Sequence, residues 1–597
     1  MKPTSLLAVV ISCLIMFVAF FFYRPWERGV LDGADSSGYY AYLPAVFIHR
    51  DILTLDKCNE ARRMYSSRGS ASTAKLSNGH HLNQYTCGVA LLELPAFFVA
   101  HIFALLSDYP PDGYSFPYSF MVVLAGLLYV FFGLYFLRLF LLNYFSENVV
   151  AVALLIVGLG TNLYYIGVLK GGMAHAHLFF LTAVFLWLSQ KWKSTSQAKQ
   201  FYGLALLLGF ITLVRPNMLV LGLLLPFMVG RSFFQLFKRP LRLLIGVVLF
   251  ILPFVPQFYY WKMITGDYIV YSYGNQGFDF LNPHIIEGLL GFKNGWLIYT
   301  PIMFFALLGL ILGMKKGDNP ALGIFFVLDI HIYVIYSWWC WNYINGFGSR
   351  PMVEMYPLLA YPLALFIRDF FRFRKVFYGV SSLLILLNIF QTHQTYGKVL
   401  WPEGATRAYY CAIFGKTQLD YEALVALDCD ITQPEHLVYK KTIAVEGFES
   451  PNISKRDSTH SFSGSSSFCI YPGLKYSPKV KTTIVNTEKH KSDWLRISAV
   501  CMSLGYASFY ENSHLVVSIS RKGKQILWKS IRINNKIRDT YYSVHNGEIN
   551  RWKEIFFFVP LSDLFLESTD EVVVYGWHNG YVPVCLDDMK LEIWGEQ

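Results

Sequence analysis

The chain has 597 residues, of which 54% are hydrophobic and only 15% are charged. Soluble domains average roughly 45–50% apolar and about 25% charged residues, so this composition excludes an ordinary soluble enzyme. The formal net charge of +11 could indicate nucleic acid, but many basic residues stand in short clusters between apolar runs, where they set membrane topology. We therefore expect a polytopic membrane protein that binds no nucleic acid.

The amino terminus carries the first predicted membrane helix. Its apolar run from Leu6 to Phe22 is long enough to span and ends in aromatic residues suited to the interface, without a small-residue cleavage signature. We expect an uncleaved span, followed by a long first outer loop over residues 24–116. Within this loop, the apolar stretch Val89 to Leu106 is predicted to be a helix in the outer interface, because a crossing there would break the charge pattern described next.

Ten further apolar runs follow, which brings the prediction to about eleven transmembrane helices. They cover residues 117–138, 149–168, 175–190, 201–215, 217–230, 242–262, 297–314, 321–339, 352–367 and 376–393. Four basic segments, 191–199, 231–242, 315–316 and 368–375, are each separated from the next by two spans, so they lie on one side. The positive-inside rule makes that side cytoplasmic, with the amino terminus.

The last part of the chain has normal soluble composition. From about Val445 it consists of short period-two runs, such as 515–519 and 571–575, separated by turn residues. This pattern predicts an extracytoplasmic β-sandwich or jelly roll. The predicted domains are therefore 1–400, transmembrane; 401–444, a linker; and 445–597, the β domain.

The nine cysteines include no C-x-x-C pair and no Cys/His spacing suited to zinc. Disulfides between Cys58 and Cys87, or between Cys411 and Cys429, would be compatible with an oxidising compartment. Free thiols are an equally weighted alternative. The sequence thus supports no structural metal site.

Two carboxylates stand immediately after the first span. Asp32 and Asp35 are three residues apart and precede Ser36-Ser37-Gly38-Tyr39-Tyr40. If the turn is helical, residues i and i+3 share a face, so the pair could present a general base to a substrate at the interface. Alternatively, either aspartate is a helix N-cap.

Other outer segments are rich in aromatic and amide side chains. The second long outer loop contains Tyr273, Asn275 and Gln276, and the Trp-rich turn near residue 340 contains Trp341. Aromatic faces can stack on a sugar ring while amides bind hydroxyls, and Tyr39 and Tyr40 could contribute in the same way. The alternative is an aromatic belt at the membrane surface.

Several cations fall on the same predicted outer side. An arginine at the mouth of a helix bundle can hold a phosphate with its planar fork, which makes Arg350 the first candidate. The others are Arg215, Lys170, His175 and Lys293. The alternative for each is an interface residue that snorkels to lipid head groups.

Taken together, these segments resemble the GT-C superfamily of integral-membrane glycosyltransferases, which includes protein O-mannosyltransferases and the aminoarabinose transferase of lipid A. The residues that carry the resemblance are Asp35 with Tyr39-Tyr40; Tyr85-Thr86-Cys87-Gly88 leading into Leu91-Leu92-Glu93-Leu94-Pro95; the loop from Gly295 to Thr300-Pro301; and Trp338-Trp339 with Gly346-Phe347-Gly348-Ser349-Arg350-Pro351. The resemblance covers about residues 1–400.

The resemblance implies sugar transfer from a polyprenyl-phosphate donor to a lipid, glycan or protein acceptor, with inversion, at the outer face of a bacterial inner membrane. Members of the superfamily often have adjacent acidic residues in the first loop; here Asp32 and Asp35 are separated, and Asp35 is favoured as the base. No cofactor is required, although a divalent metal could assist through the carboxylates. The alternatives are a lipid or glycan flippase or transporter, and a polysaccharide polymerase or ligase.

Overall fold

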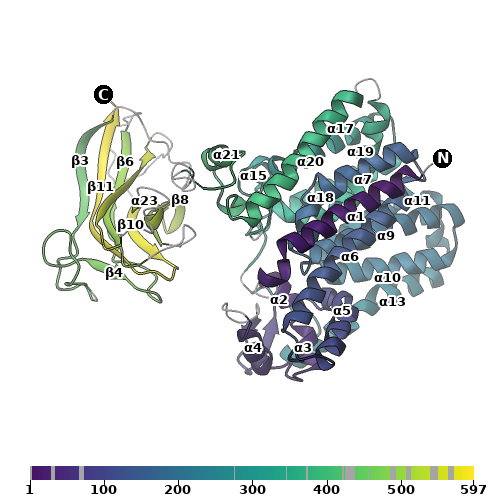
Figure 1. Cartoon of the computed structure of the whole chain (residues 1–597), viewed down its shortest axis with the longest axis horizontal. Helices are drawn as coiled ribbons and strands as arrows, with labels where there is room; N and C mark the ends of the chain where they lie inside the picture. Colours follow the sequence, from purple (N-terminus) through teal and green to yellow (C-terminus); the bar gives the residue numbers. More distant parts are fainter. Residues whose placement is uncertain are drawn as a thin grey trace. The chain divides into compact units, whose positions relative to one another are not determined.

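The structure is a computed structural model that describes residues 3–28, 34–65, 73–274, 276–344, 346–370, 374–419, 423, 426, 437–454, 456–483, 493–505, 513–537, 549–561 and 570–596. The chain divides into two compact units, Met1–Tyr396 and Gly397–Gln597. The first is predominantly helical and the second is built around two β-sheets (Figure 1). The segment predicted as a linker, 401–444, contains helix α21 (Arg407–Ile413) and most of strand β3 (Leu437–Glu446).

All eleven apolar runs contain helix. The helices are α1 (Thr4–Tyr23), α6 (Phe116–Leu141), α7 (Glu147–Leu159), α8 (Leu163–Leu169), α9 (Ala174–Thr195), α10 (Ala198–Val214), η3 (Pro216–Leu224), α11 (Leu225–Val229), α12 (Arg231–Gln235), α13 (Pro240–Ile251), α14 (Val255–Thr265), α16 (Trp296–Tyr299), α17 (Phe304–Lys315), α18 (Asn319–Tyr336), η7 (Arg350–Met355), α19 (Tyr356–Asp369) and α20 (Arg374–Tyr396). Several runs that the sequence predicts as single spans are interrupted. For example, α7 and α8 are bent by 57°.

Judged by length and composition, fewer helices could span a membrane than the eleven predicted. Among the described residues, six helices are long and apolar enough to cross a membrane, or up to eight if each bent pair is one span. Two predicted spans correspond to the shorter apolar helices Ala198–Val214 and Pro301–Lys315, and α9 has 22 residues but is not among the helices that are both long and apolar enough. Helix α5 (Gly88–Leu105) does meet it, so its predicted interfacial position stays a prediction.

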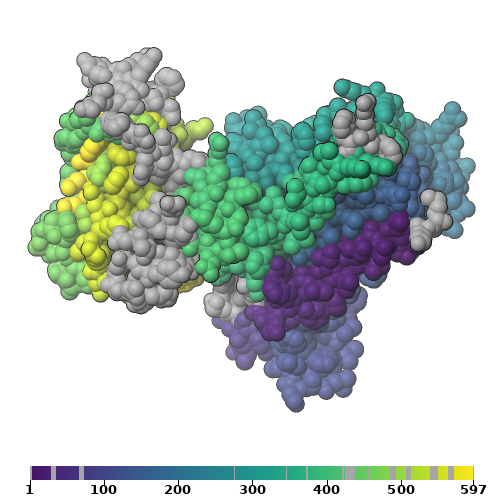
Figure 2. Space-filling model, turned by 45° about the horizontal axis from the view of Figure 1, so that its top comes forward, coloured from purple at the N-terminus to yellow at the C-terminus, as the bar shows by residue number. Residues whose placement is uncertain are grey.

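Large apolar side chains on the surface of the first unit support an integral membrane protein. Along α1, Leu14 and Phe22 are 60% and 67% exposed, and along α13 Leu241 is 69% exposed. Figure 2 shows α1 and α20 side by side on this surface, where the Tyr23 and Tyr396 rings are 4.6 Å apart. A soluble monomer rarely exposes continuous apolar surface on this scale, whereas lipid would cover it.

The basic segments gather at the end of the helical unit that carries the amino terminus. Thr4 donates a hydrogen bond to Asn148, and nearby Lys193 lies over the ring of Tyr144 at 5.8 Å. At the same end, Arg368 lies over Phe145, Lys316 pairs with Asp369, and Ser196 bonds to Ser232 beside Arg231. The predicted outer loops are at the other end. Which end faces the cytoplasm stays a prediction.

The first predicted outer loop folds into short elements around its own apolar core. They are α2 (Ala34–Tyr40), α3 (Tyr42–Phe47), α4 (Asp56–Arg63), the hairpin of β1 (Thr73–Lys75) with β2 (His81–Asn83), and α5. Tyr40, Phe97 and Tyr114 are buried together in this core. The loop is thereby fixed to α5 and α6, which positions α2 at the end of the helical unit (Figure 1).

The second unit contains two antiparallel sheets that share one core. One sheet has the order β5 (Val480–Thr483), β10 (Glu571–His578), β7 (Ser513–Arg521), β8 (Lys524–Arg532); the other has β3, β11 (Val584–Glu596), β6 (Asp493–Ser503), β9 (Lys553–Pro560), with β4 (Phe468–Ile470) also on β11. Alternate residues, such as Val517 in the first sheet and Ile497 in the second, pack in this common core. The arrangement is sandwich-like; a jelly-roll topology stays a prediction.

The disulfide in the structure is not one that the sequence suggested. Cys469 in β4 is bonded to Cys585 in β11, which face each other in the sheet. Cys58 and Cys87 are separate buried thiols, so the first suggested pair is wrong. Cys411 is an exposed thiol, and Cys429 lies outside the described residues.

Candidate active site

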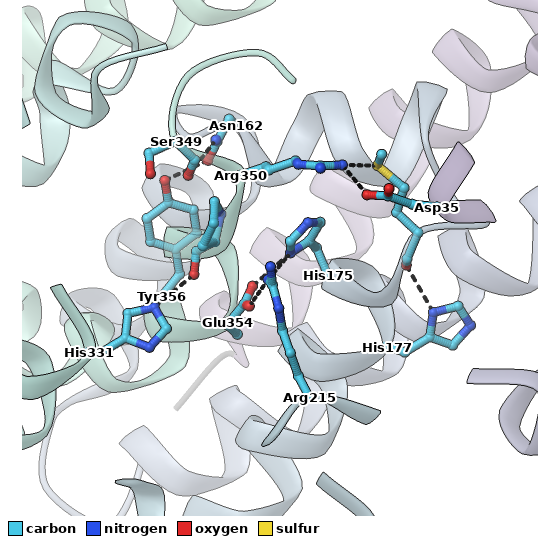
Figure 3. A network of polar contacts seen from close by, with 12 residues as sticks. Asp35, Asn162, His175, His177, Arg215, His331, Ser349, Arg350, Glu354 and Tyr356 are labelled. Atoms are coloured by element: carbon cyan, nitrogen blue, oxygen red, sulfur yellow. Dashed lines mark hydrogen bonds and ion pairs between the residues drawn. The ribbon is translucent and has the colours of Figure 1, made fainter. Parts of the chain in front are cut away.

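The favoured base and the favoured phosphate ligand contact each other. Arg350 Nη1 donates to Asp35 Oδ2 at 2.5 Å, although the two residues are 315 positions apart in the chain (Figure 3). Asp35 lies in the first turn of α2, and Arg350 begins the 3-10 helix η7. The side chains are 22% and 9% exposed, so the ion pair is largely shielded from water. The fold therefore brings the candidate acid–base group to the candidate anion ligand.

The environment of Asp35 keeps its carboxylate ionised. Its other oxygen, Oδ1, accepts a hydrogen bond from the Tyr85 hydroxyl at 2.7 Å. Burial by itself would raise the pKa of Asp35, but the charge of Arg350 and the hydroxyl of Tyr85 together hold that pKa below its ordinary value. Burial and the adjacent carboxylate raise the pKa of Tyr85, so this phenol stays a proton donor.

A second carboxylate holds two more of the predicted cations. Glu354 Oε1 accepts from Arg215 Nη1 at 2.6 Å, and Glu354 Oε2 accepts from His175 Nδ1 at 2.9 Å (Figure 3). The Glu354 side chain is 0% exposed. Arg215 follows α10, and His175 is in the first turn of α9. The site thus contains two couples: in the first the Asp35 side chain is 22% exposed, and in the second Glu354 is fully buried while Arg215 is 20% exposed.

One aromatic ring connects the two couples. Both guanidinium groups lie over the ring of Tyr343, Arg215 at 5.8 Å and Arg350 at 5.9 Å from its centroid. On the Asp35 side, the rings of Tyr39 and Tyr85 are 4.6 Å apart, and Tyr85 and Tyr273 are 6.2 Å apart. The charged groups are therefore bordered by aromatic rings, of which Tyr39, Tyr85 and Tyr343 are buried.

The backbone before Arg350 is fixed by buried hydrogen bonds. Gly348 has φ +65°, and a Cβ there would come within 2.9 Å of Tyr299, so only glycine fits this turn. Asn162 Nδ2 donates to the carbonyl of Phe347, while the Tyr336 hydroxyl donates to Ser349 Oγ. This framework leaves little freedom in the position of Arg350.

Close approach of backbone elements positions Asp35 from the other side. A Cβ on Gly172 would come within 3.3 Å of Ser36, which shows how near α2 lies to the turn before α9. The next residue, Met173, accepts a weak hydrogen bond from Arg350 Nη1 to its sulfur at 3.7 Å. The predicted cation Lys170 begins this same turn.

Some predicted site residues lie elsewhere. Tyr40 is wholly buried and donates to the carbonyl of Gly113, so its hydroxyl is used inside the first loop; its role in sugar binding stays a prediction. Trp341 stacks on His284 at 5.2 Å, and Gln276 accepts from Gln84. Among the described residues, no hydrogen bond or ion pair joins Lys293, an exposed residue, to the Asp35–Arg350 couple. Asp32 and Asn275 lie outside the described residues.

Sequence reasoning did not assign Glu354, Tyr343 or Tyr85 to the site. Glu354 is a carboxylate within an apolar run, which often indicates function. Tyr85 and Tyr343 stand in the quoted motifs, but nothing in their local sequence distinguishes them from other aromatic residues of the outer segments.

The acidic groups of the site are already paired with cations. Asp35 and Glu354 both bond to guanidinium groups, so these four groups together carry no net charge. In the second unit, Asp457, His460, Cys469 and Cys585 cluster within metal-binding distances. Because these two cysteines form a disulfide, their sulfurs are not thiolate ligands and the cluster lacks a metal-binding donor set.

Comparisons with known proteins add a distant likeness. No protein-family model matches the chain, and no curated protein matches it. Among solved structures, it is similar to the arabinosyltransferase EmbB from Mycobacterium smegmatis, with a TM-score of 0.32 and 10% sequence identity over 98% of this chain and 64% of that chain. The chain thus spans less than two thirds of the length of that protein. A likeness of this size identifies no activity.

Proposed function

We propose that the chain is a glycosyltransferase that moves a sugar from a polyprenyl-phosphate donor to an acceptor at the outer face of the membrane. The observation that carries the proposal is the Asp35–Arg350 contact, which joins an acid–base group to an anion ligand in a site bordered by Tyr39, Tyr85 and Tyr273. The apolar helices of the same unit would hold the lipid part of the donor. A protein that binds only soluble phosphate would not need such helices.

The proposed reaction makes one bond and breaks one. The acceptor oxygen or nitrogen attacks the anomeric carbon while the bond from that carbon to the phosphate oxygen breaks, and the configuration inverts. Asp35 takes the proton of the acceptor, and the phosphate departs with one more negative charge, stabilised by Arg350 and Arg215. A base of this kind contributes about 10²–10⁴-fold, and fixed cations lower the barrier by electrostatic preorganisation.

The resting ion pair implies an order of events. While Arg350 and Tyr85 both donate to Asp35, its carboxylate is a weak base. A donor phosphate bound to Arg350 would replace Asp35 as the acceptor from that guanidinium. Asp35 would then regain basicity beside the sugar. Donor binding therefore activates the base, and the empty site does not deprotonate an acceptor.

The proposed orientation places the amino terminus inside, the site outside, and the β unit outside, in a bacterial inner membrane. Two observations support it. The basic segments gather at the end of the helical unit opposite the site, which favours that end as cytoplasmic. The Cys469–Cys585 disulfide is of the kind that persists in oxidising compartments.

Transfer can be tested directly. Purified protein in nanodiscs is incubated with polyprenyl phosphates carrying single hexoses, pentoses or aminopentoses, and mass spectrometry follows release of the polyprenyl phosphate. In parallel, glycolipids and glycoproteins from cells lacking the protein are compared with those from the parent strain. We expect sugar release in vitro and loss of one glycan in the cells. Translocation of intact donor across vesicles without sugar release would instead identify a flippase.

A further inference from the structure

Glu354 is the most enclosed charge near the site, and the proposed reaction gives it no chemical step. It is 0% exposed, and both carboxylate oxygens are used, one by Arg215 and one by His175. Asp35 differs because its side chain is 22% exposed and its partners are an arginine and a phenol. The Asp35–Arg350 pair is therefore partly exposed, whereas Glu354 is enclosed between its partners.

We propose that Glu354 is a positioning residue that, held by His175, fixes Arg215 as the second half of an anion site facing Arg350. The inference rests on the proposed function in treating the anion as a lipid phosphate. Arg350 binds one side of the phosphate and exchanges Asp35 for it. Arg215 and His175 remain bonded to Glu354 throughout: Arg215 presents its remaining N–H groups to the other side, whereas the one N–H of neutral His175 is used to hold the Glu354 carboxylate.

The geometry of His175 supports this assignment. A nitrogen 2.9 Å from a carboxylate oxygen must carry the hydrogen between them, so Nδ1 is protonated and Nε2 is the remaining nitrogen. Carboxylates commonly fix a functional imidazole in this way. Asp35, Arg350, Arg215 and His331 are the other charged or titratable groups near His175. Glu354 therefore sets both the ring orientation and the tautomer.

The geometry of Arg215 supports it as well. Only Nη1 of Arg215 bonds to Glu354 and approaches His175, at 2.6 Å and 3.2 Å. The guanidinium plane is held over Tyr343, the ring that Arg350 also contacts. Both guanidinium groups thus contact one ring, and the buried Nε of Arg350 has no hydrogen-bond partner in the described structure.

The test measures binding of undecaprenyl phosphate to the full chain in nanodiscs, together with thermal unfolding. Glu354→Gln keeps the shape but can no longer accept from both partners, and we expect its Kd to rise about 10- to 100-fold. The matched control is Glu93→Gln, because Glu93 is also 0% exposed but lies in α5, outside the site. We expect the control to bind as the wild type does. Equal binding by wild type and Glu354→Gln would overturn the inference.

A second pair of variants separates positioning from simple stability. Arg215→Met leaves the buried Glu354 charge without its guanidinium, so we expect a lower unfolding temperature. Adding Glu354→Gln should restore much of that temperature, because the unpaired charge is removed. It should not restore affinity for undecaprenyl phosphate. Recovery of affinity in the double variant, which lacks Arg215, would show that Arg215 does not bind the phosphate and would overturn the inference.

These outcomes are distinguishable from failure of the proposed function. If no sugar is transferred but Glu354→Gln weakens lipid-phosphate binding, the positioning role stands and the glycosyltransferase proposal falls. If sugar is transferred and Glu354→Gln has wild-type Kd and wild-type KM for the donor, the reverse holds. Absence of lipid-phosphate binding by the wild type would contradict both.

Discussion

Replacing Asp35 by Asn tests the proposed base most directly. The change keeps the size of the side chain and one oxygen acceptor, but it removes the charge that pairs with Arg350 and the ability to take up a proton. We expect the loss of general-base catalysis to lower turnover by about 10²–10⁴-fold, equivalent to about 3–5 kcal/mol of transition-state stabilisation. Donor affinity should be retained or improved, because Asp35 no longer competes with the phosphate for Arg350.

The same contact predicts a cost in stability. Asn has one oxygen for the two donors Arg350 and Tyr85, so one of them loses its acceptor. An unsatisfied buried donor costs about 1–3 kcal/mol. This cost is smaller than that of breaking a fully buried ion pair, because the Asp35 side chain is 22% exposed. Asp35→Asn should therefore unfold at a lower temperature while remaining folded at the assay temperature.

The assay compares kcat, donor KM and the unfolding temperature of purified wild type and Asp35→Asn. Glu147→Gln is the matched control, since Glu147 pairs with Arg138 at 3.3 Å with similar exposure in the same unit but at the opposite end. We expect the control to show comparable destabilisation and unchanged turnover. Wild-type turnover by Asp35→Asn would refute the role of this aspartate. Equal loss of turnover by the control would attribute the effect to stability.

Three further predictions follow from the same contacts. Arg350→Lys should lose at least about tenfold in kcat/KM although the charge is kept, because an ammonium cannot reproduce the planar fork over Tyr343; near-normal kinetics would assign the phosphate to Arg215. The pKa of Asp35 is lowered, so its carboxylate stabilises the fold above the ordinary aspartate pKa, and this stabilisation is lost as pH falls through the lowered value. The unfolding temperatures of wild type and Asp35→Asn should therefore converge below about pH 4. Reporter fusions after Lys199, Lys316 and Lys375 should be cytoplasmic and one after Gln433 external; a cytoplasmic signal at Gln433 would contradict the orientation.

Helix could be predicted in every apolar run, but the number of spans could not, since among the described residues six to eight helices are long and apolar enough to cross, against the predicted eleven. The interruptions of these runs could not be placed either. The bend between α7 and α8, for instance, lies at a turn where the Thr161 hydroxyl donates to the Val157 carbonyl and Asn388 of α20 donates to the carbonyls of Leu159 and Thr161. Such a break depends on a partner far along the chain, which hydropathy does not report.

The candidate site was predictable in its residue types but not in its pairings. Asp35, Arg350, Arg215 and His175 were each identified from charge and location, but no local pattern shows that the first two bond to each other and the last two share one carboxylate. The burial of Tyr40 could not be predicted from its neighbours in the sequence. This residue is adjacent to Tyr39 in sequence, but successive positions on a helix face different directions, so Tyr39 borders the site and Tyr40 lies in the core of the first loop.

The balance of charge explains why the proposed base and the proposed phosphate ligand are adjacent. Asp35, Glu354, Arg215 and Arg350 sum to zero, so a phosphodiester donor adds one negative charge to the enclosed site. When the bond to the sugar breaks, the phosphate gains a second negative charge, and at the same time Asp35 loses its own by taking the acceptor proton. The total is unchanged, and the new charge forms beside the guanidinium that Asp35 had occupied. A base far from Arg350 would instead separate charge across a medium of low dielectric, where that separation is most costly.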